Sequence, residues 1–300
     1  MESRRKSVSS NVITRAYLDS LLVELRHLDA VKPSTEMTVY GKTFATPITT
    51  AALSHMHRYY PDGMAEMARG AYEAGALVFS GMGPEDELES MVNTGASVIK
   101  IIKTYTDRDS IRAKIRHAEE CGALAVGIDI DHAFNRKTGY DIVEGLPQYP
   151  LSLKELEEFV KMTSLPFVIK GVLSRQDARK CLDVGVQGMV VSHHAGRLDS
   201  CIPPLMILPE ILEETQGKVP LFVDCCIETG MDVFKALALG ATACSVGKPV
   251  MKALQEKGAE GVRQYIDETT RDLAYTMGMT CSRDLASIDP SVVRAGSFTW

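Results

Sequence analysis

Short apolar runs rich in β-branched residues alternate along the chain with longer segments of helical period. Eight such runs lie at residues 45–52, 76–81, 97–103, 123–130, 167–172, 188–193, 221–225 and 243–247. The amphipathic segments cover residues 62–74, 107–121, 152–162, 174–184, 204–215, 231–240 and 251–265. Strands that alternate with helices in this way predict βα units and a parallel sheet.

The number of units selects the architecture. Eight strand–helix units in ~250 residues are typical of a (β/α)8 TIM barrel, whereas a doubly wound sheet usually has fewer strands and a reversal in their order. We therefore predict an α/β protein with a single-domain barrel over residues 45–265. Residues 1–44 and 266–300 are predicted to be an N-terminal appendage and a C-terminal helical or irregular extension, both packed on the barrel.

Charge and hydropathy argue against two classes of partner. The chain has 33 Lys and Arg against 39 Asp and Glu, a formal net charge of −6, and nucleic acid or an anionic membrane would require a clustered basic excess. Only Arg4, Arg5 and Lys6 form such a cluster. The longest uncharged apolar stretch, 236–247, is well short of the ~20 residues of a membrane span. The N-terminal residues lead into no apolar run of a secretory signal, so we expect a cytoplasmic protein.

The seven cysteines are odd in number and lack the paired spacing of a zinc ribbon or a disulfide framework. We expect them to be reduced and mostly buried. The adjacent Cys225 and Cys226 could be redox-active or bind metal, but we interpret them as small apolar residues at a strand end.

Titratable residues gather where the predicted strands end, and the C-terminal strand ends and their loops form the active site of a (β/α)8 barrel. The candidates are His55, His57, Asp129, Asp131, Lys170, His193, His194, Arg197 and Asp224. A lysine in the buried run 167–172 must pair with an anion or point into the barrel mouth, so we expect Lys170 to be functional. A base at His194 and a guanidinium at Arg197 suit the activation of a 2-hydroxy acid, although by spacing alone a loop histidine is more often a surface residue.

Two glycines begin predicted helices at the same end of the barrel. Gly230 precedes the helix after the seventh strand, and Gly247, followed by Lys248, precedes the helix after the eighth. Many barrels bind phosphate there through backbone N–H groups at helix N-termini, to which Lys248 would add a positive charge. Taken alone, glycines required by turns and a solvated lysine explain these residues equally well.

Five ordered segments in the second half of the chain match a known family. They are Ile169-Lys-Gly-Val-Leu, Val190-Val-Ser-His-His-Ala-Gly-Arg-Leu-Asp, Val223-Asp, Gly230-Met-Asp-Val-Phe-Lys-Ala-Leu-Ala-Leu-Gly-Ala and Gly247-Lys-Pro-Val. In this order they resemble the C-terminal half of the FMN-dependent α-hydroxy acid oxidases and dehydrogenases, which include glycolate oxidase and lactate oxidase. Weaker similarity extends the resemblance over roughly residues 35–290, in agreement with the eight predicted units.

This resemblance implies the oxidation of a small 2-hydroxy acid to the 2-oxo acid by a flavoprotein, with FMN as cofactor. His194 resembles the family's catalytic base, and Asp131 the carboxylate that orients it. Arg197 resembles the arginine that holds the substrate's carboxylate, and Lys170 the lysine that stabilises the reduced flavin. The further cofactor-binding residues implied by the resemblance are Asp129, Ser192, Asp224, Gly230, Gly247 and Lys248. The resemblance also implies a homo-oligomer, a tetramer.

The chain departs from the family pattern around the cofactor. The segment Asp224-Cys-Cys-Ile-Glu228 stands where the family has Asp-Gly-Gly-x-Arg, so that a carboxylate replaces a phosphate-binding arginine, and Lys248 replaces a second arginine. Asp129 replaces a threonine near the flavin, and Ile101 and Lys103 replace a glutamine and a tyrosine. The N-terminal segment that supplies an active-site tyrosine is missing or unrecognisable. We therefore expect weak binding of FMN.

Two other functions stay open. His55 and His57, with Lys170, His193 or His194, and Asp224, could bind a divalent metal in a barrel hydrolase. A catalytically degenerate member that acts as a binding or assembly protein would also fit the loss of the phosphate arginine. Yellow purified protein would support the flavoenzyme, whereas stoichiometric zinc or manganese without colour would support the hydrolase.

Overall fold

The computed structural model describes residues 8–296, and the basic cluster Arg4, Arg5 and Lys6 lies outside them. Eight parallel strands form the central sheet. They are β4 (Ile48–Thr50), β5 (Val78–Ser80), β6 (Val98–Lys103), β7 (Ala125–Asp129), β12 (Phe167–Val172), β13 (Gly188–Val191), β14 (Leu221–Val223) and β15 (Ala243–Val246). Each strand lies inside one of the eight predicted apolar runs.

The sheet closes into a barrel. Its strand order is β4-β15-β14-β13-β12-β7-β6-β5, and the two end strands meet where the Phe79 N–H donates to Thr50 Oγ1 at 3.0 Å. A parallel bridge between Leu53 and Ser80 extends this contact. The predicted (β/α)8 TIM barrel is therefore confirmed.

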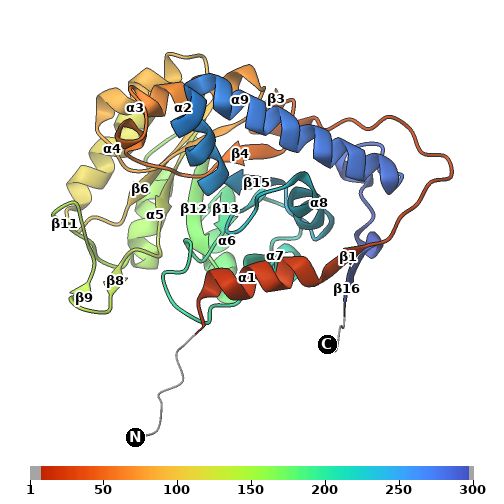
Figure 1. Cartoon of the computed structure of the whole chain (residues 1–300). Coiled ribbons are helices and arrows are strands. Elements are labelled where there is room, and N and C mark those ends of the chain that lie inside the picture. The colour runs from red at the N-terminus through yellow and green to blue at the C-terminus, as the bar shows by residue number, and fades with distance from the viewer. Residues whose placement is uncertain (1–7, 297–300) are drawn as a thin grey trace, which may run out of the picture.

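A ring of helices surrounds the sheet (Figure 1). They are α2 (Gly63–Glu73), α3 (Glu85–Val92), α4 (Arg108–Glu120), α5 (Leu153–Lys161), α6 (Arg175–Asp183), α7 (Pro204–Thr215), α8 (Gly230–Ala238) and α9 (Lys248–Met279). The amphipathic pattern predicted all of them except α3, a helix of eight residues that buries only Leu88 and Met91. Helix α9 continues past residue 265, with a kink at Lys257 and Gly258. The predicted division of the chain at residues 44 and 265 stays a prediction.

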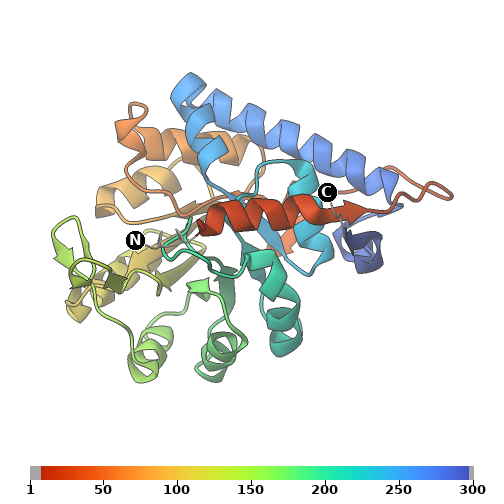
Figure 2. The same ribbon diagram turned by 60° about the horizontal axis from the view of Figure 1, so that its bottom comes forward.

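The remaining elements extend the barrel at its two ends. Helix α1 (Ser10–Ser20) leads into β1 (Leu21–Val23), which pairs with β16 (Val293–Ala295), and Figure 2 shows α1 in red crossing the middle of the molecule. Strands β2 (Met37–Val39) and β3 (Lys42–Phe44) form a hairpin. The loop after β7 holds two small hairpins, β8 (Phe134–Asn135) with β9 (Gly139–Tyr140) and β10 (Ile142–Val143) with β11 (Leu146–Pro147). Three single-turn helices complete the described chain: η1 (Met56–Arg58), η2 (Leu285–Ser287) and η3 (Pro290–Val292).

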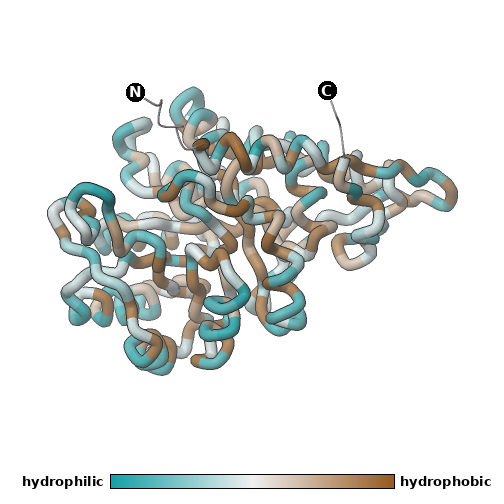
Figure 3. Tube along the Cα trace, turned by 90° about the horizontal axis from the view of Figure 1, so that it is seen from below, coloured by the Kyte–Doolittle hydropathy of each residue, from teal (hydrophilic) through white to brown (hydrophobic). Residues whose placement is uncertain are grey.

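Apolar side chains fill the barrel interior below the level of the strands' C-terminal ends. Phe79 and Phe222 meet edge to face, with 5.0 Å between their ring centroids, and the β2–β3 hairpin adds Met37, Val39 and Phe44 to the same buried cluster. A second cluster fills the layer between the strands and the helices. Figure 3 shows hydrophobic segments towards the centre and hydrophilic turns at the periphery. Within residues 8–296, no helix combines the length and apolar character that a membrane crossing requires.

All seven cysteines are free thiols, as expected. Cys181 and Cys244 are buried, but the other five are partly exposed. The expectation that most are buried is therefore wrong, because several lie on loops and at helix ends rather than inside strands. Cys225 and Cys226 lie just past β14 in the left-handed backbone region, with φ of 73° and 61°.

Candidate active site

Strand periodicity carries charged side chains into the barrel mouth. On β6, Ile99 and Ile101 belong to the apolar cluster inside the barrel, so that Lys103, two residues on, points inward as well. On β12 the same alternation places Lys170 two residues after Val168, so that its side chain also points inward. At the corresponding level, β7 ends with Asp129, and Asp224 follows β14. An apolar barrel interior therefore ends in a layer of buried charges.

Asp129 is the centre of this layer. Its carboxylate is almost completely buried and lies 2.6 Å from Lys103 Nζ, 3.2 Å from His194 Nδ1 and 3.9 Å from Lys170 Nζ. Burial alone would raise the pKa of Asp129, but the surrounding cations lower it well below its usual range. Asp129 is therefore an ionised carboxylate, and it compensates the lysines that face it.

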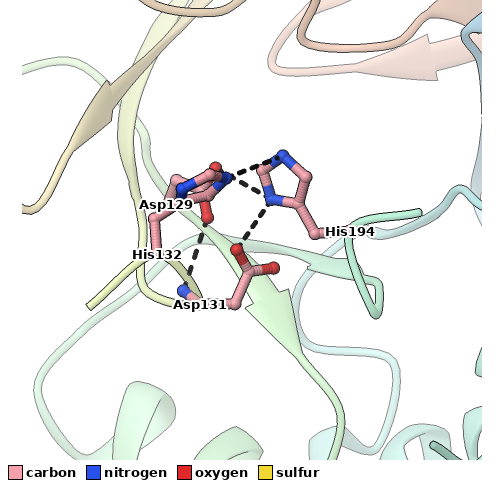
Figure 4. Close-up of side chains that lie close together, drawn as sticks. All are labelled: Asp129, Asp131, His132 and His194. Carbon is pink, nitrogen blue, oxygen red and sulfur yellow. Dashed lines mark hydrogen bonds and ion pairs between the residues drawn. The ribbon is translucent and has the colours of Figure 1, made fainter. Parts of the chain in front are cut away.

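His194 is held against the second carboxylate of this strand end. Its Nδ1 lies 2.7 Å from Asp131 Oδ1 (Figure 4), and its backbone N–H donates to Ser192 Oγ at 2.9 Å. The residue has a positive φ of 50°, a conformation fixed by the tight turn after β13. The side chain of His194 is therefore turned towards Asp131 instead of solvent.

The charges of this cluster leave a place for one proton. Its three carboxylates, including Asp224 at 3.8 Å from Lys170 Nζ, outnumber its two ammonium groups by one. Burial and Lys170 lower the pKa of His194, but Asp129 and Asp131 outweigh them and raise it above its ordinary value. Burial and the neighbouring Asp129 also raise the pKa of Asp131. Uptake of one further proton by the pair of Asp131 and His194 therefore makes the cluster neutral.

Arg197 lies on the same loop as His194 but points to another carboxylate. Its Nη2 donates to Phe134 O at 2.9 Å and forms an ion pair with the buried Asp141. Asp141 Oδ2 also lies 3.2 Å from His132 Nδ1, and His132 Nε2 lies 3.2 Å from His194 Nε2. Hydrogen bonds therefore connect Arg197 to His194 through two residues of the loop after β7.

A cavity of about 290 Å³ opens beside His194 and Lys170. Asp224 lies at the same end, and Ala51, Ala52, Leu53, Ile227 and Met251 supply apolar walls. At the other end the cavity reaches Glu228, Gly247 and Lys248. A mostly apolar cavity with a few charged groups at its ends is typical of cofactor sites.

The two helix N-termini predicted to bind phosphate differ in the structure. Helix α9 begins after Gly247 without a side-chain cap, and Gly247 and Lys248 line the cavity. Helix α8 is capped by Thr229 and Asp232, and Gly230 packs against α9, where a Cβ would lie 2.3 Å from Leu273 N. The backbone N–H groups around Gly230 are therefore largely satisfied within the protein, while the start of α9 at Gly247 and Lys248 lines the cavity.

Arg15 of α1 stabilises the loop next to Glu228. It forms two hydrogen bonds with Asp232, at 2.8 and 3.0 Å, and donates to the backbone oxygen of Cys226 at 3.1 Å. Its remaining donors bind Asp19. Because these partners occupy the guanidinium, Arg15 does not replace the arginine that the family has at position 228.

The residues of the metal hypothesis do not come together as expected. In the described part of the chain, the group whose ligand atoms could surround an ion is Asp129, Asp131, His132 and His194 (Figure 4). His55 pairs with Glu144, and His193 Nε2 lies 2.7 Å from Thr14 Oγ1. Lys103 and Lys170 already neutralise Asp129, and two ammonium groups at that distance oppose a divalent cation.

Sequence reasoning missed the roles of three members of this arrangement. Lys103 was noted only as a departure from the family pattern, although its place two residues after Ile101 is a period-two signal for an inward side chain. The sequence offered His132, which follows Asp131 directly, only as a substitute base after His193, and nothing in it indicates the contact of His132 with Asp141. Asp141 lies in an irregular loop without periodicity, where no local pattern points to the site.

Comparison with known proteins gives likenesses over most of the chain. The family model for FMN-dependent dehydrogenase matches residues 4–150 and 139–295. A 4-hydroxymandelate oxidase from Amycolatopsis orientalis is 30% identical over 308 residues, which cover 90% of this chain and 86% of that protein. The glycolate oxidase of Spinacia oleracea is 28% identical over 92% of this chain and 83% of its own length. A crystal structure of a mandelate oxidase matches with a TM-score of 0.86 at 28% identity, covering 97% of this chain and 93% of the other.

Proposed function

Because this chain belongs to the FMN-dependent dehydrogenase family, we propose that it oxidises a small 2-hydroxy acid to the corresponding 2-oxo acid with FMN. The observation that carries the proposal is the hydrogen bond of 2.7 Å between His194 and Asp131, next to the buried Lys170 at one end of the cavity. A base paired with a carboxylate, a fixed cation and an adjoining cavity are the parts that this reaction requires.

The residues that line the cavity fit FMN. Lys170 is a buried ammonium whose nearest carboxylate oxygens lie as far as 3.8 and 3.9 Å away, so that it can serve a further anion at the reduced ring. The uncapped N-terminus of α9, with Lys248, faces the other end and suits a phosphate. Bound FMN supplies the acceptor for the electrons that leave the α-carbon of the substrate.

His194 is proposed as the base. Asp131 binds its Nδ1, so the substrate's proton, from the hydroxyl group or the α-carbon, is taken up at Nε2. The positive charge that then develops on the imidazole lies 3.2 Å from the buried carboxylate of Asp129. Asp129 and Asp131 together stabilise the protonated ring electrostatically and hold it in one orientation.

Arg197 is proposed to bind the substrate's carboxylate. The guanidinium has five N–H donors, and its contacts with Phe134 O and Asp141 both use Nη2. A substrate's carboxylate can therefore approach Nε and Nη1, although it competes with Asp141 for the charge of the guanidinium. Because a lysine lacks this planar fork, arginine suits the role.

FMN affinity is proposed to be low. Glu228 lines the cavity near the start of α9, and its exposed carboxylate would oppose the phosphate. Lys248 and the backbone N–H groups of α9 offset part of this repulsion. We therefore expect FMN to be lost during purification and to bind again when it is added.

The test is the visible spectrum of the protein after addition of FMN. Under anaerobic conditions, glycolate, lactate or mandelate should bleach the bound flavin, and the variant His194→Ala should bind FMN but no longer be bleached. His117→Ala is the matched control, because His117 pairs with Glu89 on the outside of the barrel. Equal bleaching of His194→Ala and wild type would contradict the proposed base. FMN binding without bleaching by any 2-hydroxy acid would favour the degenerate binding protein.

Two finer properties are also proposed. We expect the protein to be cytoplasmic, which cell fractionation tests. We expect a homo-oligomer, a tetramer by family resemblance, which sedimentation equilibrium tests. Both rest on the sequence and on family resemblance.

A further inference from the structure

The loop after β7 touches both residues that a 2-hydroxy acid would contact. His132 Nε2 lies 3.2 Å from His194 Nε2, the nitrogen proposed to accept the substrate's proton. Asp141 forms an ion pair with Arg197, the residue proposed to bind the substrate's carboxylate. One short segment of the chain therefore occupies the two ends of the proposed substrate site.

The hydrogen bonds of His132 determine where the protons lie. Its Nδ1 lies 3.2 Å from the Asp141 carboxylate, which only accepts hydrogen bonds, so Nδ1 carries the proton. Burial lowers the pKa of His132 to about 3, so its Nε2 presents a lone pair. The short contact with His194 Nε2 therefore requires a proton on His194. In this state Nε2 of the base already carries a proton, so only the form of His194 that has lost this proton, and with it the contact, can accept one from a substrate.

Asp141 is held in place by more than Arg197. Its Oδ1 accepts hydrogen bonds from Asn135 Nδ2 at 3.2 Å and from its neighbour Ile142 N–H at 3.0 Å. The carboxylate is buried, and it presents to Arg197 the same chemical group that a 2-hydroxy acid would present. A substrate carboxylate must therefore share the guanidinium with Asp141 or replace it.

The two hairpins of this segment bury few of their large apolar side chains. Phe134, Tyr140, Ile142 and Leu146 are all exposed large hydrophobic side chains on its two hairpins. A segment with few buried apolar contacts opens at low free-energy cost compared with the strands of the barrel. His132 and Asp141 can therefore give way to a ligand without unfolding of the barrel.

Building on the proposed function, we propose that His132 and Asp141 are internal competitors of the substrate and thereby determine affinity and specificity. His132 accepts the hydrogen bond from His194 Nε2–H that a substrate oxygen would accept, and Asp141 forms the ion pair with Arg197 that a substrate carboxylate would form. A ligand that offers an oxygen next to its carboxylate replaces both contacts. A simple carboxylic acid replaces only the contact of Asp141 and leaves the Nε2–H of His194 with His132.

Calorimetric titration of the FMN-loaded protein tests this without turnover. The probes are pyruvate, whose keto oxygen can accept from His194 Nε2–H, and propionate, which lacks that oxygen. Asp141→Asn should bind both probes about tenfold more tightly, the effect expected for release of one hydrogen bond to a charged group. His132→Ala should bind pyruvate more tightly and leave propionate binding unchanged.

The matched control is Glu144→Gln. Glu144 is a carboxylate of the same loop that pairs with His55 and Arg58 instead of Arg197. Weaker binding of both probes to Asp141→Asn would overturn the inference and make Asp141 a residue that positions Arg197. Equal effects of Asp141→Asn and Glu144→Gln would overturn it too. If Asp141→Asn fails to fold, the binding of pyruvate and propionate to His132→Ala tests the inference alone. If pyruvate binds to none of the variants, and if Arg197→Leu gives the same result as the wild type, the proposed function is overturned as well.

Discussion

The buried ion pair of Lys103 and Asp129 predicts an unequal loss of stability when either member is removed. Asp129→Asn leaves Lys103 inside the barrel without the carboxylate at 2.6 Å, while Lys103→Met leaves Asp129 with Lys170 and His194 at 3.9 and 3.2 Å. Breaking a buried pair so that one charge is unpaired costs about 3–5 kcal/mol, and we expect Asp129→Asn to reach this range. Lys103→Met should cost only about 1–2 kcal/mol, because two cations still compensate the carboxylate.

The double variant separates the pair from its surroundings. Because an uncharged thioether side chain would then face a neutral amide, the double variant should be more stable than Asp129→Asn alone, which gives a coupling free energy of about 2 kcal/mol between the two sites. Burial already lowers the pKa of Lys103. The cost of Asp129→Asn should therefore shrink as the pH rises and Lys103 loses its proton.

Urea unfolding of the FMN-free protein, followed by circular dichroism, measures these free energies. Lys161→Met is the matched control, because it breaks an exposed pair with Glu157 and should cost less than about 1 kcal/mol. If Lys103→Met cost as much as Asp129→Asn, or if the two losses simply added, the two side chains would not be coupled. The charge layer described for the barrel mouth would then be refuted.

The remaining predictions concern the cofactor, the pH dependence and the substrate. Glu228→Arg should tighten FMN binding about tenfold, since it changes the charge by two units at an exposed site, and Lys248→Glu should weaken FMN binding. A fluorescence titration with FMN measures both effects. If the wild type already binds FMN tightly and Glu228→Arg leaves its affinity unchanged, Glu228 points away from the phosphate. The folded state raises the pKa of His194, so its contribution to stability is fully present below the unfolded pKa of about 6.5 and is lost as the pH rises through the folded pKa. The difference in unfolding free energy between wild type and His194→Gln should therefore shrink with rising pH, and a growing difference would contradict this sign. Arg197→Lys should mainly raise KM for the 2-hydroxy acid in steady-state kinetics, whereas a loss confined to kcat would place Arg197 elsewhere in the reaction.

The sequence predicted the barrel because its signal is local and repeated. Each strand is a short apolar run and each long helix has an apolar stripe, so that the eight strands and most helices follow from composition along the chain. Helix α3 escaped prediction because most of its burial comes from two side chains. The length of α9 also escaped, because the kink at Gly258 interrupts its period.

The site was predicted as far as it follows from strand ends. Asp129 ends a strand, Asp224 follows one and Lys170 lies near the end of another, and parallel strands in a barrel bring such positions to one mouth. The resemblance added His194, Asp131 and the expectation of FMN. Neither source indicates how far one side chain lies from another.

Tertiary structure alone decided which groups are already paired. The sequence places Asp141 and Arg197 56 residues apart in unrelated loops, and only the folding of the loop after β7 onto the barrel mouth brings them together. In the same way, only the folded structure separates Gly230 from the cavity, because it packs Gly230 against α9. Hydrophobic period is a property of neighbours along the chain, so the sequence determined the barrel. Ion pairs between loops depend on the path of the chain in three dimensions, so only the folded structure determined them.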